Sequence, residues 1–541
     1  MEEEYSVSDP TLLLISASDF AFHPGFQSDS STKEFLDRFP LPVIINALQT
    51  KGDVPGLENA LVACLERIFK TKYGASLIPQ YMPFIVVGLG ADSQKVRCVA
   101  CKTVSCLLEN SDETTVSAAR LVIEYDVYPL LLKCLTDGDE QVAAAAMDAI
   151  RNFAGSAEGM DIIFPANTNE ATHLRNVAAG CSSLGRVRVL ALIVKLFSIS
   201  SSVATVVYNS NLLSPLEAEI SNVNDTLAAL SVLELFYELA EIQHSTEFLS
   251  RTTLLQLLST MISNASIGSI LRARAMMIIG RLMSKENVFM FIDESGAKTV
   301  ISAIDGRLGL LESQDADECE CALEALGQIG MIHNSMPMLR HQVLEGLVDQ
   351  HSILCAIQGA TLLLSNSPPA ARHVVDAAFD RHGHGKQLAA LHALGNIAGE
   401  TRSESNRMLN VDGEENLRVY LFFFSCLSVY IVQKIDQVVA AFPQGLFLSV
   451  LQQDSEIRLA GYRLIAGLTA RPWCLMEICS RQEIINIVTD AFTETTKIGM
   501  EASDPNLAGI AAKLEEAVRR GPYLARKHSE AQPAVMTAER F

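Results

Sequence analysis

The stretch "LHALGNIAGE", Leu391 to Glu400, decides how this chain folds. Two glycines and an asparagine so close together are typical of a turn that cradles a ligand. They are equally typical of one copy of a helical repeat, because small residues let neighbouring helices approach closely. The choice decides whether to search the chain for an active site or for a binding surface.

The pattern recurs along the chain. "ALGNIAG" (393–399) resembles "AIRNFAG" (149–155), "ALGQIGM" (325–331) and "IIGRLMS" (278–284), and further copies are looser. Each copy has an apolar residue, two variable residues and a second apolar residue, often followed by a small one. The copies are anchored on Leu65, Val104, Ile150, Val194, Leu233, Ile279, Leu326, Leu394 and Ile465. The first six steps, 39, 46, 44, 39, 46 and 47 residues, match the period of armadillo and HEAT repeats. The last two, 68 and 71, predict inserted helices or loops near 340–370 and 403–435.

Each copy has the apolar spacing of a helix. In "DGDEQVAAAAMDAIRNFAG" (137–155) the apolar residues Val142, Ala145, Ala146, Ala149, Ile150 and Phe153 share one helical face. Asp137 and Asp139 supply capping chemistry at the start, and Gly155 suits the end. Pro368 and Pro369 predict another helix start. Strand-like alternation is nearly absent. We therefore predict an all-α fold, an armadillo/HEAT-like α-solenoid, in which the small residues of 391–400 are helix contacts.

The same features divide the chain into five parts. We expect a flexible acidic N-terminus and first helix over 1–30, armadillo/HEAT-like repeats over 31–400, an irregular insertion over 401–436, C-terminal repeats and a capping helix over 437–527, and a flexible tail over 528–541. The insertion contains the uncharged segment 419–432. At fourteen residues it is shorter than the ~20 needed to span a bilayer. It is buried or interfacial, or it marks a misassigned exon boundary.

Charge and cysteine usage narrow the function. The formal net charge of -21 repels phosphate backbones and favours a basic or amphipathic protein partner. We expect no nucleic-acid partner and no membrane partner. The acidic start lacks the basic region of a signal peptide, and twelve cysteines in so long a chain do not form a secreted disulfide framework. We expect a reducing compartment, the cytoplasm, with the nucleus as a second location.

Motifs for catalysis are missing from the sequence. It has no Walker A pattern, no HExxH and no GxSxG in a strand–helix context. Cys98 and Cys101 form a CxxC without the second pair that a zinc site needs, so we interpret them as core. His382 and His384 lie in a glycine-rich segment typical of a solvated connection. The acidic run 312–325 is a solvated helix start or a docking spot for a basic partner. We predict no metal, no cofactor, no enzyme, and no pocket with converging titratable groups.

The C-terminal region carries a family resemblance. "SEIRLAGYRLIAGLTARPWCLMEI" (455–478) places Arg471-Pro472-Trp473 after a repeat helix, and "LAGIAAKLEEAVRRGPYLARK" (507–527) ends in Gly521-Pro522-Tyr523. With 34–49, these motifs resemble the non-ATPase regulatory subunit five family of the 26S proteasome, and a plant member in particular. The resemblance implies an assembly chaperone that binds the C-terminal domain of an ATPase subunit of the regulatory-particle base. It would escort a base intermediate, then leave before the proteasome is complete. We expect a monomer apart from that complex.

The repeat nominates partner-binding residues. In armadillo-type repeats the last helix lines the concave surface, and residues two after and two before each anchor face outward. The polar members of these ladders are Arg67, Lys102, Asp148, Asn152, Arg281, Glu324, Gln328, His392 and Asn396. Leu196 and Leu235 interrupt the ladder. If they are exposed, they would form a hydrophobic strip and a second contact zone.

Two other functions remain open. One is an armadillo-type adaptor for transport complexes of the importin or catenin kind, although such repeats carry a regular Trp–Asn array and this chain has one tryptophan, Trp473. The other is a substrate-recruiting subunit of a ubiquitin ligase, which would need a partner to supply the ligase domain.

Overall fold

The computed structural model describes most of the chain. The described residues are 10–50, 54–110, 117–165, 173–222, 225–285, 294–308, 316–329, 368–400, 408–419, 443–479 and 481–489, with single positions at 288, 292, 402, 421, 512, 516 and 519. They form two compact units, Met1–Leu235 and Phe236–Phe541, and each is described by itself.

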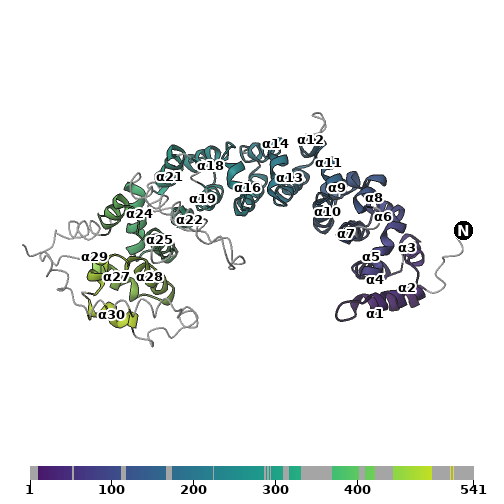
Figure 1. Cartoon of the computed structure of the whole chain (residues 1–541), viewed down its shortest axis with the longest axis horizontal. Coiled ribbons are helices and arrows are strands. Elements are labelled where there is room, and N and C mark those ends of the chain that lie inside the picture. Colours follow the sequence, from purple (N-terminus) through teal and green to yellow (C-terminus); the bar gives the residue numbers. More distant parts are fainter. Residues whose placement is uncertain are drawn as a thin grey trace, which may run out of the picture. The chain divides into compact units, whose positions relative to one another are not determined.

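The first unit is a succession of short helices (Figure 1). They are α1 (Pro10–Phe22), α2 (Asp29–Arg38), α3 (Leu41–Thr50), α4 (Leu57–Phe69), α5 (Lys72–Leu77), the 3-10 helix η1 (Ile78–Tyr81), α6 (Met82–Leu89), α7 (Gln94–Glu109), α8 (Ala118–Glu124), α9 (Val127–Asp137), α10 (Glu140–Phe153), α11 (Ala157–Ile163), α12 (His173–Gly180), α13 (Ser183–Phe197), α14 (Ser201–Asn209) and α15 (Ser214–Ile220). Helix α16 (Thr226–Glu241) spans the boundary between the units.

The second unit continues with helices of the same kind. They are α17 (Ser245–Leu249), α18 (Leu254–Ser263), α19 (Ser269–Met283), α21 (Glu294–Leu308), α22 (Ala316–Ile329), α24 (Pro368–Phe379), α25 (His384–Ala398), α27 (Pro443–Leu451), α28 (Ser455–Leu468), α29 (Pro472–Cys479) and α30 (Gln482–Thr489). No strand occurs among the described residues. The predicted all-α architecture of stacked helical repeats is confirmed.

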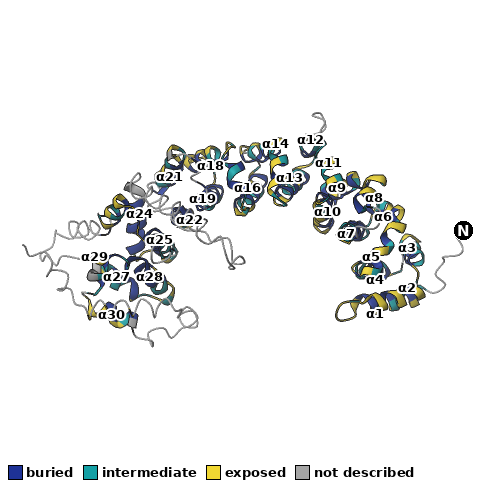
Figure 2. Ribbon diagram, in the orientation of Figure 1, coloured by how far each residue is buried: buried dark blue, intermediate teal, exposed yellow. Residues whose placement is uncertain are grey.

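Successive repeats pack through their longest helices. In the first unit α7 packs between α4 and α10, and in the second α19, α22, α25 and α28 follow one another (Figure 1). Each of these helices has a buried face and an accessible face (Figure 2). A repeat alone could not bury its apolar face, so neighbouring repeats together form a continuous core within each unit.

Helix α10 illustrates why these residues form a repeat helix. Asp139 is its N-cap, and the carboxylate accepts a hydrogen bond from the Val142 amide at 2.8 Å. The other capping candidate, Asp137, instead ends α9. The six predicted core residues of 137–155 are all buried. The helix ends at Phe153 with Ala154 as C-cap, one residue before the predicted Gly155.

Small residues bring the long helices of the second unit into backbone contact. A Cβ built on Gly327 of α22 would lie 2.6 Å from the Cα of Ala393 in α25, and one on Gly467 of α28 would lie 3.1 Å from the Cβ of Ala398. A side chain at Gly327 would therefore push α22 and α25 apart. The small residues of 391–400 are helix contacts, as predicted, and Gly399 ends α25 in the left-handed conformation with φ of 91°.

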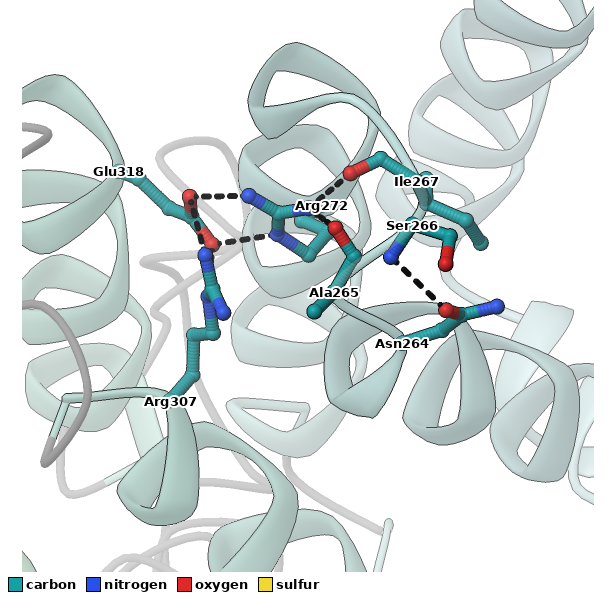
Figure 3. Close-up of polar contacts among 7 residues, drawn as sticks. All are labelled: Asn264, Ala265, Ser266, Ile267, Arg272, Arg307 and Glu318. Atoms are coloured by element: carbon teal, nitrogen blue, oxygen red, sulfur yellow. Dashed lines mark hydrogen bonds and ion pairs between the residues drawn. The ribbon is translucent and has the colours of Figure 1, made fainter.

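The structure corrects the interpretation of the acidic run 312–325 as a solvated helix start. Glu318, in the first turn of α22, is not solvated: its side chain is fully buried between two arginines (Figure 3). Arg272 of α19 donates to both carboxylate oxygens at 2.7 and 2.8 Å. Arg307 of α21 donates to the same carboxylate at 2.7 Å. Burial alone would raise the pKa of Glu318, but the two guanidinium groups outweigh it and lower the pKa. Glu318 thus joins three helices. The neighbouring Asp317 is exposed, as predicted for a solvated helix start.

Arg471, a residue of the family motif, has a structural role of the same kind. Its side chain has no exposed surface. It donates to the carbonyl oxygens of Ala398 and Gly467 at 2.8 and 2.9 Å and to the Glu414 carboxylate at 2.8 and 2.7 Å. The next residue, Pro472, begins α29. The motif therefore ties the end of α25 to α28.

The structure confirms some of the remaining predictions and contradicts others. Cys98 and Cys101 are buried on α7, which confirms the core interpretation. Pro368 begins α24. His382 is exposed in the connection before α25, as predicted, whereas His384 begins that helix. Leu196 and Leu235 are both buried, so they form no exposed hydrophobic strip. Helices α13 and α16 bury a wide apolar face, and the ladder position on each belongs to that face.

Several predictions lie outside the described residues. They are most of the segment 419–432, most of the predicted insertions near 340–370 and 403–435, and Gly521-Pro522-Tyr523. Among the helices that the structure describes, none combines the length and the apolar character needed to cross a membrane.

Candidate functional site

The nominated residues of the earlier repeats contact neighbouring helices of the chain itself. Asn152 of α10 donates from Nδ2 to Oε1 of Glu109, on α7, at 2.8 Å. Lys102 of α7 forms an ion pair with Glu66 of α4.

Two further nominated residues behave in the same way. Arg67 of α4 donates from Nη1 to the carbonyl oxygens of His23 and Gly25 at 2.9 and 2.8 Å. Arg281 of α19 forms an ion pair with Glu241 and lies over the ring of Tyr237. These side chains connect successive elements, so their polar groups are already used within the chain. Asp148 is exposed on α10.

Four nominated residues come together in the second unit. Glu324 and Gln328 of α22 and His392 and Asn396 of α25 line one groove with a volume of about 530 Å³. Such a volume lies within the range of ligand-binding clefts, ~300–1,000 Å³. Gly395 and Ala393, both buried, belong to its floor. The sequence "LHALGNIAGE" thus has two roles, since one face of the helix packs and the other lines the groove.

Three more charged groups complete the lining, and none of them was nominated. Glu320 lies one turn before Glu324, Glu400 follows the end of α25, and Arg463 comes from α28. The sequence carried a signal for two of them. Glu320 shares a helix face with Glu324, four residues on, and the ladder continued to the last anchor, Ile465, reaches Arg463.

The groove is acidic. Three carboxylates, Glu320, Glu324 and Glu400, face one guanidinium, Arg463. Burial lowers the pKa of His392, and the charge of Arg463 lowers it further. The imidazole is therefore neutral near pH 7, and the ionised groups of the lining carry two more negative than positive charges.

Gln328 lies in the wall of the groove and differs from its predicted outward position. It is 9% exposed. Its Nε2 donates to Oε1 of Glu324 at 3.2 Å. Its Oε1 is buried without a hydrogen-bond partner and lies against Gly280 of α19. An unpaired buried acceptor is unfavourable.

The groove contradicts the expectation that no pocket with converging titratable groups exists. Its lining nevertheless contains no serine, threonine, cysteine or lysine, so it offers carboxylates and a neutral imidazole but none of these usual nucleophiles. Among the described residues no group of three or more histidine, cysteine, aspartate or glutamate side chains is arranged so that it could hold a metal ion. The arrangement suits recognition of hydrogen-bond donors and positive charge.

Comparison with known proteins gives one family match. Residues 58–274 match the family described as proteasome non-ATPase 26S subunit. The match runs from α4 into α19 and supports a proteasome regulatory-subunit family. It ends before the groove-lining residues of α22, α25 and α28. No curated protein matches the chain.

Similar solved structures are remote. An engineered protein has 14% identity and a TM-score of 0.41, with 88% of this chain and 98% of that chain covered. A second engineered protein has 12% identity and a TM-score of 0.35, covering 56% and 96% of the two chains. A third structure, from work on a phosphorylation switch in the interaction between cadherin and beta-catenin, has 14% identity and a TM-score of 0.31, covering 94% and 97%.

Proposed function

We propose that this chain is an assembly chaperone of the 26S proteasome. It belongs, on this proposal, to the non-ATPase subunit five family, and it binds the C-terminal domain of one ATPase subunit of the regulatory-particle base. It accompanies a base intermediate and leaves before the proteasome is complete. The single observation that carries the proposal is the match of residues 58–274 to the proteasome non-ATPase 26S subunit family.

The physical character of the chain supports a binding role over catalysis. Helical repeats offer extended accessible faces, and such faces mostly bind other proteins. The net charge of -21 favours a partner with basic surface and speeds association with it. The groove has the chemistry of recognition, and we propose that the protein is not an enzyme and needs no cofactor.

Purification from cells tests this function. Tagged protein is recovered from lysate, the bound proteins are identified, and the same fraction is assayed for proteasomal peptidase activity. We expect ATPase subunits of the base without peptidase activity. Recovery of transport receptors or ubiquitin-ligase components without any ATPase would replace the proposal with the adaptor function. Recovery of active proteasomes would identify a resident subunit instead of a chaperone.

A further inference from the structure

The groove between α22, α25 and α28 has carboxylates without a cationic partner, whereas several carboxylates at other helix contacts have one. Where Glu66 and Glu241 meet the next repeat, Lys102 and Arg281 neutralise them. Glu318, on the same helix as the groove carboxylates, has two arginines. At these three positions the chain supplies a cation for the carboxylate.

Glu320 and Glu324 lack such a partner. Within the described part of the chain neither forms an ion pair, and Glu324 accepts only the hydrogen bond from Gln328. The α25 positions that face Glu324 across the groove are His392, which is neutral, and Asn396. Arg463 stands on the His392 side, where its charge acts on the imidazole.

We propose that a lysine or arginine side chain of a partner protein occupies this groove and pairs with Glu320 and Glu324. Two observations independent of the carboxylates fit such an occupant. The groove is a cavity of about 530 Å³, large enough for a long side chain and a short length of backbone. Leu388 and Ala389 in its wall suit the apolar stem that lysine and arginine bury while their charge reaches polar groups.

This inference names the recognition chemistry of the proposed chaperone and rests on that function for the identity of the partner. The binding of a basic side chain is tested separately. The probe is a fluorescein-labelled decapeptide with Lys-Arg-Lys in a Gly-Ser background. A peptide of the same length with three serines in place of the basic residues serves as control. Binding to the full chain is followed by fluorescence anisotropy at low and high salt.

The groove variant is Glu320→Gln/Glu324→Gln. Neither residue has an ion pair in the described part of the chain. Glutamine has the shape of glutamate, so the change removes charge and keeps the contact of residue 320 with Gly385 of α25. The matched control is Glu456→Gln/Glu483→Gln, since both residues are exposed on the same unit and lie outside the groove. A second variant, Glu324→Lys, supplies the groove with a cation of its own and should block the peptide.

The expected result is binding of the basic peptide but not of the serine peptide. The groove variant should bind about tenfold or more weakly, because each charge-assisted contact contributes strongly to affinity, and the control variant should bind as the original protein does. Equal binding by the groove and control variants would overturn the proposal, since general attraction to an acidic protein would then explain it. Absence of binding by the original protein would overturn it as well.

Purification from cells distinguishes a failure of the groove proposal from a failure of the proposed chaperone function. A groove variant that still recovers base ATPase subunits at the original yield would overturn the role of the groove and leave the chaperone function standing. Binding of the basic peptide without recovery of any ATPase would overturn the function and leave the groove as a receptor for basic side chains.

Discussion

Replacement of Glu318 by glutamine offers the sharpest test of how the second unit is held together. The buried carboxylate neutralises Arg272 and Arg307 and joins α22 to α19 and α21 (Figure 3). Glu318→Gln keeps the shape but leaves two buried guanidinium groups without a counter-charge. Removal of one partner from a buried ion pair costs ~3–5 kcal/mol. At ~2–4 °C per kcal/mol for a unit of this size class, the melting temperature should fall by roughly 6–20 °C.

Circular dichroism at 222 nm during heating measures this loss, and the chain supplies a matched control. Asp317, the neighbouring acidic residue in the same helical turn, is exposed. Asp317→Asn should change the melting temperature by no more than about 2 °C, because surface substitutions are usually within ~0.5 kcal/mol. If Glu318→Gln melts together with Asp317→Asn, the Arg–Glu–Arg cluster does not stabilise the unit and the reasoning is wrong.

Three further predictions follow from the same structure. The folded state lowers the pKa of Glu318 from its usual 4.5. The contribution of this carboxylate to stability should therefore be complete above pH 4.5 and disappear as the pH falls through the lowered pKa. Denaturant titrations between about pH 3 and pH 7 should show this loss in the original protein and not in Glu318→Gln. Gly327→Val should destabilise the second unit by ~1–3 kcal/mol, because the new side chain would collide with Ala393. Gly306→Ala should instead stabilise the unit by ~0.5–1 kcal/mol, because a Cβ there meets no atom within 4 Å. Urea unfolding measures both changes. Arg471→Met should cost ~3 kcal/mol or more, because buried carbonyl oxygens and a carboxylate lose their donor; an unchanged urea midpoint would contradict that account.

Local sequence patterns predicted the helices because the information is local. The apolar face of 137–155, the Asp139 cap and the small residues of 391–400 depend on spacings within one or two helical turns. The ladder of polar residues likewise led to Glu324, Gln328, His392 and Asn396, four of the groove residues. What it could not predict is which ladder positions are already paired within the chain.

Tertiary partners explain the failures. Glu318 looks like a solvated helix start, and only the fold brings it to Arg272, 46 residues away. Leu196 and Leu235 occupy ladder positions, but α13 and α16 bury so wide an apolar face that both residues lie in the core. The excess negative charge of the groove also could not be predicted from local sequence, because it arises where α22, α25 and α28 meet.

Direct binding to isolated ATPase domains tests the central claim most directly. The full chain is titrated by calorimetry with the purified C-terminal domain of each ATPase subunit of the proteasome base in turn. The proposed function predicts a one-to-one complex with one of these domains and no heat with the others. Binding to none of them would contradict the assembly-chaperone function, whatever the groove itself binds.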